Sequence, residues 1–268
     1  MSVAETKPSL SGNEVLQEQF IPDHVFLYVT TGAIACYDGN KSYTFKSGEY
    51  FLARKNRLAR YNSKKEDGEL KYVFFCFEET LIRDFQQKHK LKVMQFDPAD
   101  TFVKISSTEL IPDFIHSLKP YSDCSGKIDE AFQDVKYEEL LIVLLKNQPE
   151  LAGILFDYGR PEKINLEEFM SRNYRFNVSV ERFAYLTGRS LSAFKRDFKT
   201  IFNKTPNHWL IQKRLQEAYF LIEKMNKKPS EIYLELGFED LSHFSFAFKK
   251  LFRLTPRMLI EQKKNTSG

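Results

Sequence analysis

The sequence predicts an α+β protein, with an antiparallel β unit and attached helices followed by an all-helical C-terminal unit. Short β-rich segments separated by turn residues fill residues 20–78. Two similar helical segments follow each other after residue 178. The charge balance also changes sign, with 19 Lys and Arg against 24 Asp and Glu in residues 1–159, and 21 against 12 in residues 160–268. We therefore expect two domains, residues 1–156 and 164–268, joined by a polar linker at 157–163 that contains Gly and Pro.

The first half contains five segments with the composition of β-strands. A hairpin turn signal, Asp38-Gly39-Asn40-Lys41, lies between the second and third, and Ser47-Gly48 precedes the fourth. The segments are Val25–Thr30, Ala33–Tyr37, Tyr43–Phe45, Tyr50–Ala53 and Leu70–Phe77. Strands at this spacing predict a small antiparallel barrel or sandwich.

Helical periodicity follows the strands. We expect helices at residues 79–90, 111–118 and 128–146, with a further apolar stretch at 151–156. The third helix is strongly apolar on one side and acidic on the other. Its predicted core residues are Ala131, Val135, Leu140, Leu141, Val143, Leu144 and Leu145.

Four basic residues follow the fourth strand: Arg54, Lys55, Arg57 and Arg60. We expect an exposed loop there, and the alternative is a site for an anionic ligand or an acidic partner surface. The histidines His24, His89, His116, His208 and His243 lack ligand spacing, so we expect no metal and no cofactor. No Gly-rich phosphate loop and no Ser/Cys–His arrangement is present, so we expect no enzyme.

Cysteine usage and hydropathy bear on the compartment. The three cysteines, Cys36, Cys76 and Cys124, are odd in number and widely spaced, which predicts reduced thiols. The N-terminus lacks the basic and apolar pattern of a signal peptide. No apolar run approaches the ~20 residues of a membrane helix. We therefore expect a soluble cytoplasmic protein that does not bind a membrane.

A nine-residue motif occurs twice, in similar form, in the second half. Residues 198–206 read FKTIFNKTP, and fifty positions later residues 248–256 read FKKLFRLTP. Gly188 pairs with Gly237 at an offset of forty-nine. Such self-similarity indicates a duplicated structural unit. We expect two helical units on either side of one long helix at residues 206–223, which begins with Pro206 in its first turn.

Each copy has the pattern of a helix-turn-helix, near residues 178–202 and 229–252. Ser179 is the predicted N-cap of the first copy, and glycine ends the first helix of each. The predicted inner residues of the second helices are Leu191, Phe194, Phe198, Ile201 and Phe202, then Leu241, Phe244, Phe248 and Leu251. The predicted outer residues are Ser192, Lys195, Arg196 and Lys199, then Ser242, His243, Phe246, Lys249 and Lys250.

Such second helices fit the major groove of double-stranded DNA. The basic C-terminal half attached to a mildly acidic one favours nucleic-acid binding by one domain. We expect recognition helices 190–202 and 240–252 to read adjacent major grooves about one turn, or ~34 Å, apart. The alternative is a protein-interaction module with weak or non-specific DNA binding.

The stretch from Gly237 to Lys250, followed by Phe252 and Thr255-Pro256, resembles the signature of the AraC/XylS family of bacterial transcription regulators. The resemblance covers about residues 160–260 and implies seven helices, with two helix-turn-helix units joined by a long helix. It implies base contacts from Ser192, Lys195, Arg196, Ser242, His243 and Phe246, and phosphate contacts from Arg189, Ser190, Lys199 and Lys249.

Two positions depart from that family pattern. Phe246 stands where the family often has Arg, so bidentate guanine reading is lost there, although Phe can touch a thymine methyl. Tyr233 stands where a small Ala is usual, so helix packing in the second copy is expected to differ.

The first half resembles the cupin-like regulatory domain of many AraC-type proteins, through Gly48-Glu49-Tyr50-Phe51-Leu52. That resemblance implies control by an effector, either a small molecule or a protein. It also implies a homodimer contact through the helix at 128–146, and RNA polymerase as a further partner if the protein is an activator.

Overall fold

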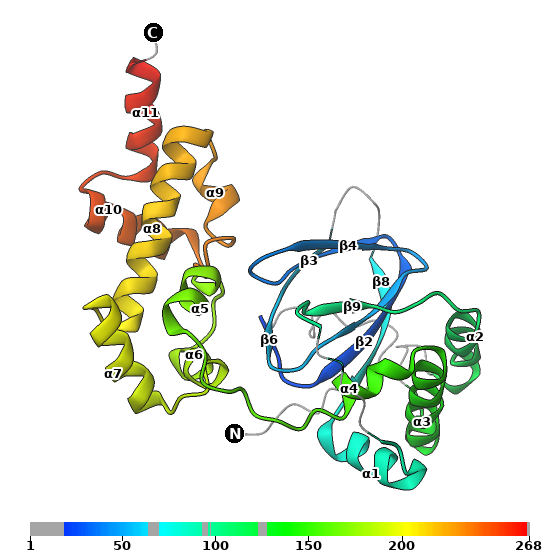
Figure 1. The fold of residues 1–268 in the computed structure, drawn as a ribbon. Helices are drawn as coiled ribbons and strands as arrows, with labels where there is room; N and C mark the ends of the chain where they lie inside the picture. The colour runs from blue at the N-terminus through cyan, green and yellow to red at the C-terminus, as the bar shows by residue number, and fades with distance from the viewer. Residues whose placement is uncertain (1–18, 64–69, 93–95, 97, 123–127, 267–268) are drawn as a thin grey trace. The chain divides into compact units, whose positions relative to one another are not determined.

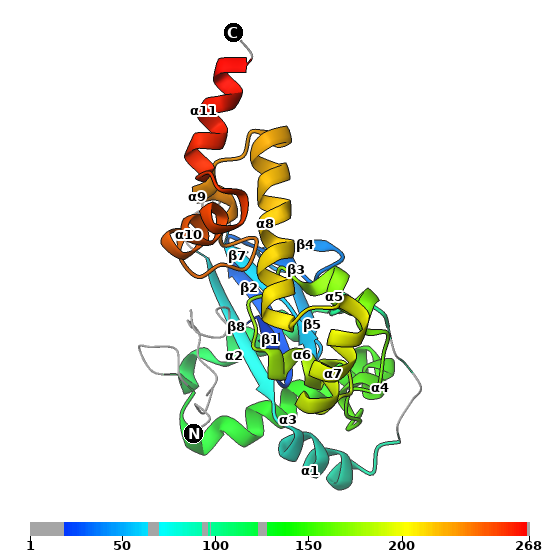
Figure 2. The same cartoon turned by 90° about the vertical axis from the view of Figure 1, so that its left-hand side faces the viewer.

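The structure, a computed structural model, describes residues 19–63, 70–92, 96, 98–122 and 128–266 (Figure 1). The chain divides into two compact units, Met1–Gly159 and Arg160–Gly268. The first contains antiparallel sheets with helices, and the second is helical (Figures 1 and 2). This confirms the predicted α+β class.

Three antiparallel sheets build the first unit. Their strands lie in the orders β8-β2-β5-β9, β4-β3-β7 and β1-β6. The bounds are β1 Phe20–Ile21, β2 His24–Thr31, β3 Ala33–Tyr37, β4 Ser42–Lys46, β5 Tyr50–Ala53, β6 Arg57–Leu58, β7 Arg60–Ser63, β8 Lys71–Phe77 and β9 Phe102–Lys104. All five predicted strands are present, and β1, β6, β7 and β9 were missed because each has only two to four residues.

The four-stranded sheet is buried on both faces. Along β2, Leu27 and Val29 pack with Ile34 of the three-stranded sheet, whereas Phe26 packs with helical residues such as Leu140. Successive side chains of a strand point to opposite faces, so the alternation of β2 serves two cores. The first unit therefore has three layers: three-stranded sheet, four-stranded sheet and helices.

The helical layer contains α1 Glu79–His89, α2 Leu110–Ser117, α3 Glu130–Asn147 and α4 Ala152–Leu155, with 3-10 turns at Lys119–Tyr121 and Pro149–Leu151. The three predicted helices are confirmed. The predicted core face of α3 is wrong at its start, because Ala131 is exposed and Val135 is 62% exposed, while Lys136 is buried. The Lys136 ammonium donates to Ser117 Oγ at 2.9 Å and to Glu139 at 2.8 Å, so its aliphatic stem can pack inside.

The basic cluster after β5 is not the exposed loop that we expected. Arg54 is only 6% exposed and donates to the carbonyl oxygens of Pro98 and Asp100. Arg57 and Arg60 lie half-buried on β6 and β7. The short strands pair with β1 and β3, and this pairing brings the arginines into the sheet surface.

The second unit contains α5 Leu166–Asn173, α6 Val180–Leu186, α7 Leu191–Phe202, α8 Pro206–Met225, α9 Pro229–Ile232, α10 Leu241–Phe252 and α11 Pro256–Thr266. The duplication is visible in how helices begin and end. Ser190 caps α7 by accepting from Ala193 N, and Asp240 caps α10 by accepting from His243 N. Both helices end in a left-handed residue, Asn203 or Arg253.

The first helix of the second copy is shorter than predicted. α9 spans four residues, and a hydrogen-bonded turn continues to Gly237, which has φ of +84°. Leu234 is 56% exposed, because it lies in this turn and not on the inner face of a continuous helix. Tyr233, the unusual residue here, lies partly buried against the core around Phe244 and Phe248.

Cys36 and Cys76 are free thiols, and Cys124 lies outside the described residues. Within the described ranges, no helix has both the length and the apolar character needed to cross a membrane.

Candidate nucleic-acid interface

Helix α7 has a buried edge and a basic exposed face. Phe194 and Phe198 are 0% exposed and hold the helix against the core. The opposite face carries the four residues predicted from sequence, and all are exposed: Ser192, Lys195, Arg196 and Lys199. The structure thus brings the predicted base-contacting residues of the first copy together on one helix face.

Arg196 is the most prominent of these side chains. It is 76% exposed and donates to Asp197 Oδ1 at 3.3 Å. The hydrogen bond from Arg189 is the main reason that the pKa of Asp197 lies below its usual range. Asp197 is therefore charged at neutral pH and restrains Arg196 without covering it.

Arg189, which we expected at phosphate, lies largely inside the protein. Its side chain is 8% exposed, and its guanidinium donates to Asp197 Oδ2 at 3.2 Å, to Thr187 O at 2.7 Å and to Ile164 O at 2.9 Å. A phosphate contact would have to compete with these three acceptors. Ser190 is exposed at the start of α7, with its hydroxyl used as the N-cap.

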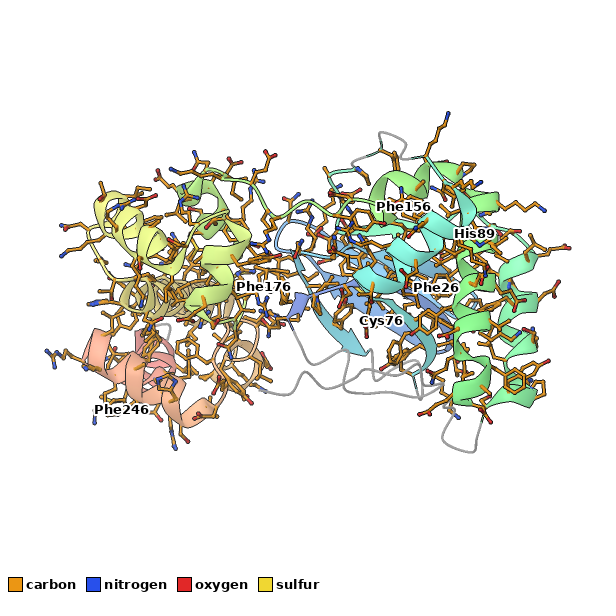
Figure 3. The ribbon with its side chains drawn as sticks, turned by 90° about the horizontal axis from the view of Figure 1, so that it is seen from below. Phe26, Cys76, His89, Phe156, Phe176 and Phe246 are labelled. Carbon is orange, nitrogen blue, oxygen red and sulfur yellow. The ribbon has the colours of Figure 1, made fainter. Side chains whose placement is uncertain are left out.

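Helix α10 repeats this arrangement with different chemistry. Ser242, His243, Phe246 and Lys249 are all exposed, as predicted. With the fifty-residue offset, Phe246 occupies the place of Arg196, and Lys249 the place of Lys199. Phe246 is 70% exposed and lies at the outer surface of its unit (Figure 3). The second helix therefore presents an aromatic ring where the first presents a guanidinium.

The apolar stripes of both helices are narrower than predicted. Ile201 and Leu251 are 45% and 38% exposed, and Leu241 is 39% exposed. Ile201 and Leu251 lie at the edge of the stripe in the last turn, where periodicity alone does not show whether a neighbouring helix covers them.

Helix α8 separates the two recognition helices. It has 20 residues, so it is about 30 Å long. Arg214 on this helix was not predicted as a special residue, yet it is only 7% exposed and donates three hydrogen bonds to backbone carbonyls. A lone Arg in an amphipathic helix normally lies in solvent, so only the packed structure reveals this role.

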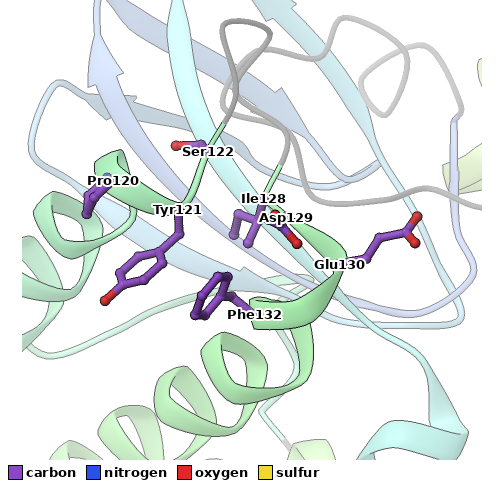
Figure 4. A pocket seen from close by; sticks show the side chains of 7 residues that line it. All are labelled: Pro120, Tyr121, Ser122, Ile128, Asp129, Glu130 and Phe132. Atoms are coloured by element: carbon purple, nitrogen blue, oxygen red, sulfur yellow. The ribbon is translucent and has the colours of Figure 1, made fainter.

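Two hollows on the surface of the first unit are lined by residues that the structure describes. One of about 400 Å³ lies where the rings of Tyr121 and Phe132 approach to 4.7 Å (Figure 4). Another of about 370 Å³ lies between α1 and α3, over Phe85, Tyr137 and Leu141. Between the sheets, aromatic rings fill the core, with Phe45 and Phe51 at 4.0 Å and Phe51 and Phe102 at 5.5 Å.

No cluster of three or more His, Cys, Asp or Glu side chains suited to a metal ion occurs among the residues that the structure describes.

Two family models match the chain. The ExsA N-terminal regulatory domain matches residues 24–154, and a helix-turn-helix domain matches residues 183–262. The chain is 28% identical over 137 residues to the virulence regulon transcriptional activator VirF of Yersinia enterocolitica, which covers 50% of this chain and 50% of VirF. The match thus spans about half the length of that relative.

Longer matches have lower identity. The transcriptional regulator ExsA of Pseudomonas aeruginosa is 20% identical over 231 residues, covering 84% of this chain and 81% of ExsA. The solved structure of ToxT from Vibrio cholerae is 15% identical, with a TM-score of 0.35, and covers 94% of this chain and 93% of that chain.

Proposed function

The chain belongs to the AraC/XylS family of transcription regulators, and on this premise we propose that it binds specific DNA sequences through α7 and α10 and is controlled through its first unit. The observation that carries the proposal is the exposed face of α7, where Lys195, Arg196 and Lys199 surround Ser192. Its relatives are named as transcriptional regulators, and we propose a non-enzymatic role in the cytoplasm, where bacterial DNA lies.

We propose base contacts from Ser192, Lys195 and Arg196 of α7, and from Ser242, His243 and Phe246 of α10. Arg can bind both acceptors of guanine, whereas Phe can only contact a thymine methyl. The first helix then supplies most of the base discrimination, and the second reads its box more weakly.

Phosphate contacts would come from Lys199 and Lys249, which occupy equivalent places on the two helices, with Ser190 at the start of α7. The engagement of Arg189 by three protein acceptors argues for a supporting role: it holds the start of α7 in place for the neighbouring Ser190. Domain limits at 156 and 164 remain predictions, and we propose that residues 157–163 act as the linker.

We propose a homodimer through α3. Its solvent side carries Phe132, Val135 and Ile142, which are 42%, 62% and 42% exposed. With Glu139 and Lys146 they follow the three- and four-residue spacing of a helix-pairing seam. An isologous contact between two copies would bury this apolar row.

We propose that an effector binds at the outer surface of the first unit. The filled aromatic core between the sheets leaves the hollows beside α3 as better places for an effector, whether a small molecule or a protein. RNA polymerase is a further proposed partner, since VirF is named an activator.

A protein-interaction module with weak DNA binding is the second candidate. The exposed ring of Phe246 favours it, because an apolar side chain at the reading position suits a protein surface better than a guanine. The excess of 21 Lys and Arg over 12 Asp and Glu in residues 160–268 favours DNA instead.

Selection of DNA from a random pool, with the full chain at two salt concentrations, tests the proposal. We expect two short boxes about one turn apart and a steep loss of binding with salt. One box would mean that α10 holds only backbone. No enriched sequence would support the interaction module.

A further inference from the structure

Helix α8 carries a buried arginine that bonds to the segment before α6 and to the turn before α10. Arg214 Nε donates to Tyr174 O at 2.7 Å, and Nη2 donates to Phe176 O at 2.7 Å. Both carbonyls belong to the segment that leads from α5 into α6. Nη1 donates to Gly237 O at 2.8 Å, in the turn before α10. A planar guanidinium fixes the directions of its donors, so these three acceptors are held in one geometry.

Three side-chain contacts reinforce the same junction. Arg175, in the loop before α6, pairs with Glu217 of α8, and Tyr174 Oη donates to the same carboxylate. Asn177 Nδ2 donates to Glu239 Oε1 at 3.1 Å, which ties the loop to the turn before α10. We call this set the Arg214 clamp: Arg214, Arg175, Glu217, Asn177, Glu239 and the carbonyls of Tyr174, Phe176 and Gly237.

The glycine in the clamp has no room for a side chain. A Cβ at Gly237 would lie 2.5 Å from Arg175 O and 2.8 Å from Arg214 Cζ, and its φ of +84° disfavours other residues. The turn before α10 therefore sits directly on the guanidinium. Any shift of α10 relative to α6 would break hydrogen bonds of Arg214 or open a gap beside it.

We propose that the Arg214 clamp sets the separation between the DNA boxes that the protein accepts, with Arg214 as a positioning residue that touches no DNA. This inference rests on the proposed reading of DNA by both α7 and α10. One inserted base pair moves the second box by about 3.4 Å and rotates it by about 35°. With the clamp intact, α10 cannot shift relative to α7 by this amount, so binding weakens. With the clamp loosened, α10 can shift and binding is retained.

The test compares binding to the selected site with the same site shortened or lengthened by one base pair between the boxes. The wild-type chain should bind the altered spacings at least about tenfold more weakly. Arg214→Met should reduce this penalty to about threefold or less, while base preference within each box stays unchanged. Lys224→Met removes the same charge from α8 outside the clamp and should keep the wild-type penalty.

Asn177→Ala guards against a folding defect, because the contact with Glu239 that it removes is exposed. Circular dichroism and thermal unfolding verify the fold, and this variant should also tolerate altered spacing better than wild type. Equal penalties in wild type, Arg214→Met and Asn177→Ala would overturn the clamp proposal alone. If the wild type selects a single box, two-headed reading itself fails, and the clamp proposal fails with it.

Discussion

Arg196 and Phe246 occupy the same place in the two copies, and the chemical difference between them means that the two helices discriminate bases unequally. The side chain of Arg196 is 76% exposed beside a charged Asp197. This ion pair restricts its rotamers before binding and so reduces the conformational entropy lost when DNA binds. Phe246 is exposed to a similar degree but has no hydrogen-bond donor. The two copies are therefore alike in backbone and unequal in discrimination.

Arg196→Ala is expected to weaken binding to the selected site by about 1–3 kcal/mol and to relax base preference at one position of the first box. The lost interaction is a bidentate contact to a base edge. Competition binding with single-base variants of the site measures both effects. Unchanged affinity and preference would show that α7 is not the reading helix.

Lys199→Ala is expected to weaken binding to all sequences alike, because the side chain would face a phosphate. The slope of log K against log salt should fall by about 0.9, one released counterion. A salt titration of the variant beside Arg196→Ala distinguishes the two roles. A change in base preference in Lys199→Ala would assign this lysine to a base.

The residues that the sequence predicted on α7 and α10 are exposed together because helical periodicity defines a face reliably. Ile201 and Val135 were misplaced for a different reason. Their exposure depends on which neighbouring elements cover a turn, and this information is absent from a local pattern. Arg214 was missed because its three partners are backbone carbonyls 23 to 40 residues away.

At the scale of elements, β2 carries a buried histidine that bears on stability. His24 Nδ1 accepts from Lys55 N at 3.2 Å. Burial first, and then the charges of Lys55, Arg54 and Arg57, together lower the pKa of His24 to about 3. The folded chain therefore keeps this imidazole neutral where the unfolded chain protonates it, below about pH 6.5.

This difference gives a pH dependence with a defined sign. Between about pH 6.5 and 3, the unfolded chain binds a proton at His24 that the folded chain does not. The free energy of unfolding therefore falls as pH falls through this window, by up to about 1.4 kcal/mol per pH unit. His24→Gln should flatten that slope in hydrogen exchange of β2, corrected for intrinsic rates. His116→Gln, at an exposed histidine, is the control, and equal slopes in all three proteins would contradict the assignment.

The apolar row on α3 predicts an effect on assembly. Ile142→Asp should convert a dimer into a monomer, because each copy would bury an unpaired carboxylate within the proposed contact, which costs free energy. Sedimentation across a concentration series measures this. Leu110→Asp alters a similarly exposed apolar residue on α2 and should leave the dimer intact. A wild-type chain that stays monomeric throughout would refute the contact.

At the scale of the molecule, a repeated motif and a charge asymmetry were enough to predict the two units. The sequence predicted the Ser179 cap, the glycines with positive φ and the long α8, since these follow from local sequence. The layers of the first unit were harder to predict from the sequence. Its short strands β6 and β9 pair with partners distant in sequence, and the buried Arg54 donates to carbonyl oxygens of Pro98 and Asp100, more than 40 residues along the chain.

Footprinting of the full chain on its selected site tests the central claim most directly, that both recognition helices enter one face of the DNA. We expect two protected major-groove segments, centred about 10 base pairs apart on the same face. Arg196→Ala should weaken protection of one segment first. A single protected segment, or two on opposite faces of the duplex, would show that α7 and α10 do not read one face of the DNA together.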